Sequence, residues 1–64
     1  MQNGRAKLAK LIRKYREDKG LTVHQLASLL DVSASTVSNA ENGRPLSIPT
    51  AFKFRRLLGE EVNA

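Results

Sequence analysis

Residues 33–43, SASTVSNAENG, gather small hydrogen-bonding side chains in a chain that is otherwise basic. The stretch has no Lys and no Arg, and its only charge is that of Glu41. Hydroxyl and carboxamide groups both donate and accept hydrogen bonds. Side chains of this kind suit contact with a finely contoured polar surface.

The rest of the chain offers no catalytic, metal or cofactor site. His24 is the single His, which we expect to be exposed, and there is no Cys. No nucleophile and base stand at a recognisable spacing, and no Gly-rich loop could cradle a phosphate. We therefore expect a binding protein without a cofactor and not an enzyme.

Positive charge lies on both sides of this stretch. The net charge is +5, which suggests an anionic partner, either nucleic acid or a membrane surface. A run of basic residues is also typical of a merely solvated face, so charge alone does not decide. The basic residues occur in two groups, Arg5, Lys7, Lys10, Arg13, Lys14, Arg16 and Lys19 before the centre and Arg44, Lys53, Arg55 and Arg56 after it.

The length of 64 residues predicts one domain, residues 1–64. A chain this short buries only about 60% of its unfolded surface, so its core is small. No apolar run approaches the roughly 20 residues that span a bilayer, and no signal peptide is evident. We expect a cytoplasmic protein that does not enter a membrane.

Apolar residues recur at spacings of three and four, which predicts an all-α fold of four helices. Residues that suit helix ends separate them: Gly20, Thr22 with Gln25 as a capping box, Ser33 and Ser47. We expect the fourth helix to end at Gly59, with EEVNA as a frayed tail. The predicted helices cover residues 5–19, 23–30, 34–42 and 48–58.

The third and fourth predicted helices each have an inner and an outer face. In the third, Val37 and Ala40 should point inward, whereas Ala34, Ser35, Ser38 and Asn39 should point outward. In the fourth, the expected inner stripe is Ile48, Ala51, Phe52 and Leu58.

The segment LTVHQLASLLDVSASTVSNAENG, residues 21–43, resembles the helix-turn-helix of the Cro and phage-repressor family, also called XRE-like. The family pattern is L-T-Q-x-x-L-A-x-x-x-G-V-S-x-x-T-I-S-x-x-E-N-G, with Val37 here in place of Ile. The flanking segments IRKYREDKG and SIPTAFKFRRLLG resemble the family's first and fourth helices. The matching residues are Leu21, Thr22, Leu26, Ala27, Val32, Ser33, Thr36, Ser38, Glu41, Asn42 and Gly43.

This resemblance implies a compact four-helix, lambda-repressor-like domain, with a fifth element at most a short terminal turn. It implies a sequence-specific regulator of transcription that binds double-stranded DNA, of the repressor or Cro-like kind, in a bacterial cell or a phage-infected host. In this motif the helix 34–42 enters the major groove, and the residues near its N-terminus meet base edges.

The resemblance also assigns roles to individual residues. Asn39 can form paired hydrogen bonds with adenine, and Ala34 can pack on a thymine methyl group. The simpler explanation of these residue types is that they form an exposed polar helix face without a DNA contact. Arg16 and Glu41 are expected to form an ion pair that holds the third helix against the first. The base-contacting candidates are Ala34, Ser35, Ser38 and Asn39, and the phosphate-contacting candidates are Arg16, Thr22, Thr36, Asn42 and Arg44.

The sequence departs from the family pattern at several positions. Val23 stands where the family has Gln, Asp31 where the turn usually has Gly, and Arg55 where relatives often bury Ala. The family's fifth helix, often its dimer contact, is missing or reduced to the tail. We therefore expect a weak homodimer, or a monomer that pairs on a pseudo-palindromic operator. Phe54 and Leu57 are candidate contacts, with a core position as the alternative for Phe54.

Two other functions remain open at this point. The chain could be a protein-interaction module that has kept the fold and lost DNA binding, which Val23 favours slightly. It could also be an antitoxin-type regulator. A basic membrane-surface peptide is excluded, because the apolar residues serve four short capped helices instead of one long face.

Overall fold

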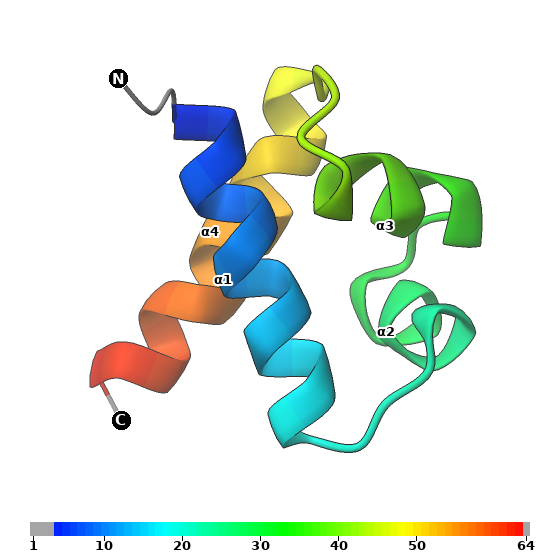
Figure 1. Ribbon diagram of the computed structural model, residues 1–64, viewed down its shortest axis with the longest axis vertical. Coiled ribbons are helices and arrows are strands. Elements are labelled where there is room, and N and C mark those ends of the chain that lie inside the picture. The colour runs from blue at the N-terminus through cyan, green and yellow to red at the C-terminus, as the bar shows by residue number, and fades with distance from the viewer. Residues whose placement is uncertain (1–3, 64) are drawn as a thin grey trace.

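Four helices make up the described part of the chain, and no strand occurs in it. They are α1 (Gly4–Asp18), α2 (Val23–Leu30), α3 (Ala34–Glu41) and α4 (Ile48–Asn63) (Figure 1). This computed structural model describes residues 4–63, and the side chains of residues 5–59. The all-α, four-helix prediction is confirmed.

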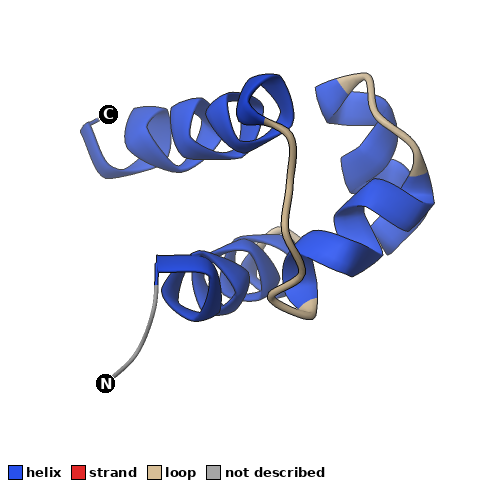
Figure 2. Ribbon diagram, turned by 90° about the horizontal axis from the view of Figure 1, so that it is seen from above, coloured by secondary structure: helices blue, strands red, loops and turns tan. Residues whose placement is uncertain are grey.

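The two long helices, α1 and α4, form two layers, and α2 and α3 lie on one side of this pair (Figures 1 and 2). α3 contacts both α1 and α2, and α4 packs on α1. No helix in residues 4–63 is long and apolar enough to cross a membrane.

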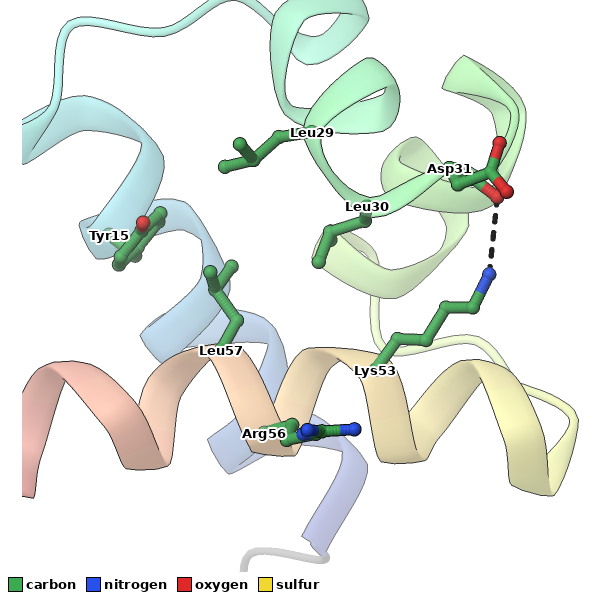
Figure 3. Close-up of a pocket in the computed structure, with 7 residues that line it drawn as sticks. All are labelled: Tyr15, Leu29, Leu30, Asp31, Lys53, Arg56 and Leu57. Carbon is green, nitrogen blue, oxygen red and sulfur yellow. Dashed lines mark hydrogen bonds between the residues drawn. The ribbon is translucent and has the colours of Figure 1, made fainter.

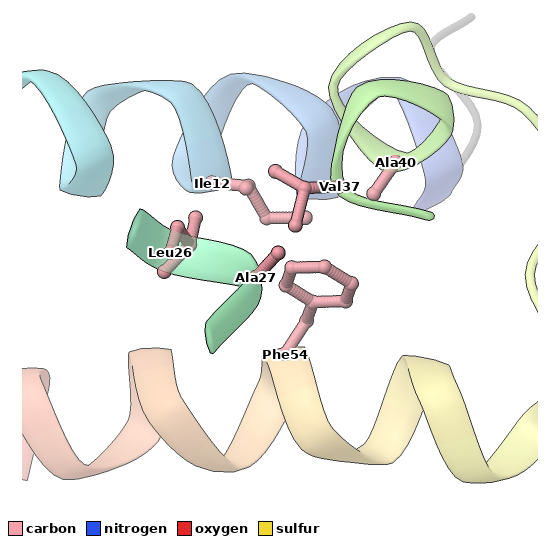
Figure 4. Packing of buried hydrophobic residues seen from close by; sticks show 6 residues of the cluster. All are labelled: Ile12, Leu26, Ala27, Val37, Ala40 and Phe54. Atoms are coloured by element: carbon pink, nitrogen blue, oxygen red, sulfur yellow. The ribbon is translucent and has the colours of Figure 1, made fainter. Parts of the chain in front are cut away.

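The core lies where all four helices converge. Ile12 of α1, Leu26 of α2, Val37 of α3 and Phe54 of α4 are almost completely buried (Figure 4). Ala27 and Ala40 complete the cluster, and their small side chains let the helices approach closely. Burying a side chain such as Leu or Phe contributes about 1.5–3 kcal/mol, so these few residues supply much of the folding free energy.

The predicted inner stripe of α4 is wrong at two positions. Ile48 is 80% exposed and Phe52 is 67% exposed, whereas Phe54 is fully buried. Residues two apart on a helix point in nearly opposite directions, so burying Phe54 turns Phe52 outward. Phe54, Leu57 and Leu58 have the spacing of one helix face, and this stripe packs against the core.

The predicted end of α4 is also wrong. Gly59 lies inside the helix, which continues through four residues of the presumed tail to Asn63; Ala64 lies outside the described residues. Gly within a helix costs roughly 1 kcal/mol relative to Ala, so it permits a helix end without forcing one. No Pro follows Gly59 to prevent the helix from continuing.

The helix α2 spans Val23–Leu30 as predicted, whereas the bounds of α1 and the end of α3 differ from the prediction by one residue. α1 spans Gly4–Asp18 instead of 5–19, and α3 ends at Glu41 instead of residue 42. Gly20 follows α1 with φ of 66°, and the Leu21 amide donates to the Arg16 carbonyl (3.0 Å). This left-handed glycine is the predicted end signal of the first helix.

A hydrogen bond ties α4 to the turn between α2 and α3. Lys53 Nζ donates to the carbonyl oxygen of Asp31 (3.2 Å, Figure 3). Asp31 itself adopts the left-handed conformation (φ 57°, ψ 49°) that Gly usually supplies at this position. Beside this bond lies an open groove of about 580 Å³ with Tyr15, Leu29 and Leu57 in its wall.

Candidate nucleic-acid interface

Side-chain caps define the starts of α2 and α3. Thr22 and Gln25 form the predicted capping box, with Gln25 N donating to Thr22 Oγ1 (3.1 Å) and Thr22 N to Gln25 Oε1 (2.8 Å). At α3, Thr36 N donates to Ser33 Oγ (3.1 Å). Both caps satisfy amides that have no partner within their own helix, and they fix where each helix begins.

α3 separates structural side chains from exposed polar ones. Val37, Ala40 and Glu41 are buried, whereas Ser35 and Ser38 are exposed and Asn39 is half-buried. Ala34 differs from the expectation, because it is half-buried and packs against the core instead of pointing fully outward. Its position in the first turn of α3, beside the turn from α2, explains this packing.

Glu41 lies at the C-terminal end of α3 with its carboxylate turned toward α1. The structure contains the ion pair implied between Arg16 and Glu41: Arg16 Nε donates to Glu41 Oε2 (2.6 Å) and Nη2 donates to Oε1 (3.1 Å). The Glu41 side chain is only 7% exposed. A two-point bond of this kind fixes orientation as well as distance, so it sets the angle of α3 to α1.

Arg13 is a member of this cluster that the sequence interpretation missed. Its Nη2 donates to the Glu41 carbonyl oxygen (3.3 Å), and its Nε lies 3.6 Å from Glu41 Oε1. Arg13 therefore places positive charge at the C-terminus of α3, where the helix dipole is negative. The signal was present in the sequence, because Arg13 and Arg16 are three residues apart and share a face of α1.

The charge of Arg16 is stabilised by its surroundings. The hydrogen bond from its guanidinium to Glu41 raises the pKa of Arg16, and burial opposes this effect only in part. A group whose pKa is raised in the folded protein contributes stability at any pH below its ordinary pKa. This contribution is lost only as the pH rises through the raised pKa. Because Arg already titrates far above neutral pH, the ion pair keeps its positive partner throughout the physiological range.

The phosphate-contacting candidates differ in how available their side chains are. Thr22 and Arg44 are exposed, and Arg44 Nη1 lies 3.5 Å from Asn39 Oδ1. Asn42 is exposed but its Nδ2 donates to the Ser38 carbonyl (2.9 Å). The half-buried Thr36 shares a hydrogen bond with Ser33 through their hydroxyls (2.8 Å).

Arg16 is the least available of these candidates. All three of its guanidinium nitrogens are engaged, two with Glu41 and Nη1 with the Leu21 carbonyl (3.1 Å). Its side chain is about one-fifth exposed. A phosphate contact from Arg16 stays a prediction. In the structure the Arg16 side chain connects α1 to Glu41 of α3 and to the Leu21 carbonyl.

The arrangement brings Ser38, Asn39, Asn42 and Arg44 together at the C-terminal end of α3 through hydrogen bonds within the segment. His24 is exposed on α2, apart from this group. In the part of the chain that the structure describes, no three His, Cys, Asp or Glu side chains are grouped to hold a metal ion.

Comparison with known proteins shows which family the chain belongs to. Residues 12–63 match the family described as Helix-turn-helix. The chain is 47% identical over 49 residues to a protein of Halobacterium salinarum named "Putative HTH-type transcriptional regulatory protein". The match covers 77% of this chain and spans about 15% of that relative's length. The chain therefore belongs to the Cro-like, XRE-type helix-turn-helix family, whose members are DNA-binding regulators of transcription and not enzymes.

Proposed function

We propose that this chain is a sequence-specific regulator of the repressor or Cro-like kind, which binds double-stranded DNA and reads the major groove with α3. The observation that carries the proposal is the division of α3 into two sides. One side is buried and braced through Glu41 to Arg13 and Arg16, and the other presents Ser35, Ser38 and Asn39. A rigidly held helix with short polar side chains can lie deep in a groove and form directional hydrogen bonds to bases.

The distribution of charge supports the same proposal. Exposed cations lie on α1 and α4 and in the loop after α3, and the described side chains of α3 include no cation. Phosphate contacts position a protein on DNA, whereas contacts to base edges distinguish sequences. Cations on the flanks can therefore contribute affinity without weakening the discrimination made by α3.

The proposal is tested by selecting duplexes from a random library and footprinting the chain on the selected DNA. We expect a short preferred sequence, protected in the major groove. Affinity should fall steeply with salt, because neutralising about four to seven phosphates releases their counterions. Equal affinity for selected and random duplexes, or a log K that is flat against log salt, would contradict the proposal.

We further propose that two copies bind a pseudo-palindromic operator with half-sites about 34 Å apart, because one short helix reads few base pairs. Free in solution the chain should be a monomer or a weak dimer. The structure removes Phe54 from the candidate dimer contacts because it is fully buried, and Leu57 is half-buried against the core. Sedimentation of the free chain at micromolar concentration measures this weak association, and a tight nanomolar dimer would contradict it.

A further inference from the structure

Asn42 and Gly43 follow one another where α3 ends, and such a pair can react with itself. The backbone nitrogen after an Asn can attack the side-chain carbonyl carbon, Cγ, of that Asn, and a Gly nitrogen is the least hindered because Gly has no Cβ. Asn42 is exposed, so water reaches its side chain. Gly43 has φ of 72°, a left-handed conformation that favours Gly at this helix end. The end of α3 therefore requires, next to Asn42, the residue that most favours this reaction.

The reaction is deamidation, which converts the carboxamide of Asn42 to a carboxylate. The Gly43 nitrogen loses its proton to solvent base and forms a bond to Asn42 Cγ. The Cγ–Nδ2 bond breaks, and Nδ2 takes up protons from water and leaves as ammonium. A water molecule then opens the succinimide ring at one of its two carbonyl groups. The product is Asp, or isoaspartate in which the main chain runs through Cβ and Cγ.

The folded end of α3 prevents this ring from closing. Asn42 has ψ of 6°, at which the Gly43 nitrogen eclipses the Asn42 nitrogen, whereas the ring requires it to lie beside Cβ. The Gly43 amide donates to the Ala40 carbonyl (3.2 Å), and Asn42 Nδ2 donates to the Ser38 carbonyl (2.9 Å). Both hydrogen bonds must break and ψ must rotate before the nitrogen can reach Cγ. Asn42 is therefore accessible to water but held in an unreactive geometry.

The ion-pair cluster between α1 and α3 holds this helix end in place. Arg13 Nη2 donates to the carbonyl oxygen of Glu41 (3.3 Å), in the peptide group that precedes Asn42. Arg16 Nε donates to the Glu41 carboxylate (2.6 Å). Helix ends open locally more often than the core unfolds, and attack on an opened segment follows the population of the open state. The cluster should therefore control how often Asn42 can react.

We propose that Asn42 is a deamidation site that becomes reactive when the last turn of α3 frays, and that the carboxylate formed there weakens DNA binding. The second part rests on the proposed function, in which Asn42 is a phosphate-contacting candidate. A carboxylate at residue 42 has no amide donor and repels phosphate. It also adds negative charge where the dipole of α3 is already negative. Because ammonium is lost to solvent, the change is permanent and limits the working life of the chain.

The first test incubates the whole chain and follows deamidation at each Asn by peptide mapping with tandem mass spectrometry. Each rate is divided by the rate of the same variant unfolded in guanidinium chloride, which removes differences in intrinsic reactivity. We expect residue 42 of the folded parent to react much more slowly than that of the unfolded parent. Glu41→Ala should speed the folded reaction by about 5–30-fold, the change in open population for a loss of about 1–2 kcal/mol, and Arg13→Ala by a smaller factor.

Other Asn residues of the chain serve as controls within the same sample. Asn39 is followed by Ala40 inside α3, so it should not react in the folded chain. Asn3 also precedes a Gly and lies outside the described residues; in denaturant, residues 3 and 42 should react alike. Isoaspartate at residue 42 is the signature of the ring, because direct hydrolysis of the side chain yields Asp alone.

Leu57→Ala separates fraying of α3 from unfolding of the whole chain. Leu57 is half-buried against the core on α4, so truncating it lowers the free energy of unfolding from a different helix. We expect Leu57→Ala to leave the reaction at residue 42 nearly unchanged. If Leu57→Ala and Glu41→Ala speed the reaction equally for an equal loss of unfolding free energy, opening is global and the proposal is wrong. Equal rates in the folded and unfolded parent, or deamidation without isoaspartate, would also overturn it.

The second test measures the affinity of Asn42→Asp, which has the charge of the product, and of Asn42→Gln, which keeps a carboxamide. The probes are the duplex selected from the random library and a random duplex. We expect Asn42→Asp to lose about tenfold in affinity on both, in line with a lost hydrogen bond to a charged group, and Asn42→Gln to lose less. Equal affinities of the two variants would overturn the effect on DNA binding. If the parent binds no duplex, the proposed function fails, whereas the rates of the first test still decide the deamidation site.

Discussion

Asn39 is the side chain on which base discrimination should depend most. It is half-buried on the exposed side of α3, and a carboxamide can form two hydrogen bonds to adenine. Asn39→Ala should therefore cost about 1–3 kcal/mol in binding to the selected duplex, with preference lost at one position in each half-site. It should cost far less on random duplex, because the phosphate contacts remain.

Arg44→Ala is the matched control for this prediction. Arg44 is an exposed cation whose guanidinium lies 3.5 Å from Asn39 Oδ1. As a phosphate contact, it should weaken binding to selected and random duplexes equally. Affinities of both variants for both duplexes, with a melting curve for each, separate base contact from phosphate contact. Equal losses on the two duplexes for Asn39→Ala would show that this residue does not read bases.

Glu41 is expected to be the most sensitive charged residue of the fold. Removing its buried carboxylate leaves Arg16 without its ion-pair partner and removes a partner of Arg13. Glu41→Ala should lower the free energy of unfolding by about 1–3 kcal/mol, less than for a fully buried pair because Arg16 is partly exposed. DNA binding should also weaken, although the lost charge is negative, because α3 loses its brace.

A double-mutant cycle with Arg16→Ala measures the coupling through urea unfolding. Arg13→Ala should cost less than Arg16→Ala, because the Arg13 side chain is about half exposed and one of its contacts is long. A coupling energy of zero between residues 16 and 41, or tighter DNA binding by the Glu41 variant, would exclude the brace.

At the scale of the helices, the turn between α2 and α3 contains a strain that can be relieved. Asp31 has a positive φ of 57°, which costs a non-glycine residue roughly 1 kcal/mol. Asp31→Gly should therefore raise the free energy of unfolding by about 0.5–1 kcal/mol, since the bond from Lys53 goes to the backbone carbonyl and is retained.

Gly20→Ala should change stability in the opposite direction. Gly20 has φ of 66°, and an added Cβ would meet no atom within 4 Å. The expected loss of about 1 kcal/mol would come from backbone conformation alone and not from a clash. Urea unfolding of both variants checks the pair, and a destabilised Asp31→Gly variant would show that the aspartate side chain itself stabilises the turn.

How far the sequence predicts these elements depends on local signals. Thr22, Gln25 and Ser33 determine helix starts through bonds that involve amides three residues away, so the starts of α2 and α3 could be predicted from the sequence. The orientation of α4 could not, because Phe52 and Phe54 offer aromatic side chains on opposite faces. Phe54 is the buried one because it fits among the core residues of α1, α2 and α3. This fit depends on how the helices pack together, which the sequence of α4 alone does not reveal.

The same division applies to the candidate site. The Arg16–Glu41 pair followed from the resemblance, whereas the burial of Glu41 and the contact from Arg13 arise from the way α1 and α3 pack. The half-buried position of Ala34 likewise depends on packing. Which bases Ser35, Ser38 and Asn39 contact remains a prediction, because it depends on the position of the DNA.

For the whole molecule, the two aromatic residues of α4 should have contrasting effects on stability. Phe54 is fully buried between the helices, so Phe54→Ala should cost about 3–5 kcal/mol. A domain of this size has only about 3–10 kcal/mol to lose, so the variant should be largely unfolded. Phe52→Ala should change the unfolding free energy by less than about 1 kcal/mol, because its side chain is mostly exposed. Thermal and urea melts compare them, and equal effects would contradict the orientation of α4.

The one-sided burial of α3 has a consequence for how this protein could change over time. Val37, Ala40 and Glu41 hold the helix in place, so positions 35, 38 and 39 are free to vary with little effect on folding. A library randomised at these three positions should consist mostly of folded proteins that prefer different DNA sequences. New target genes could then be acquired by single substitutions, without passing through unstable intermediates.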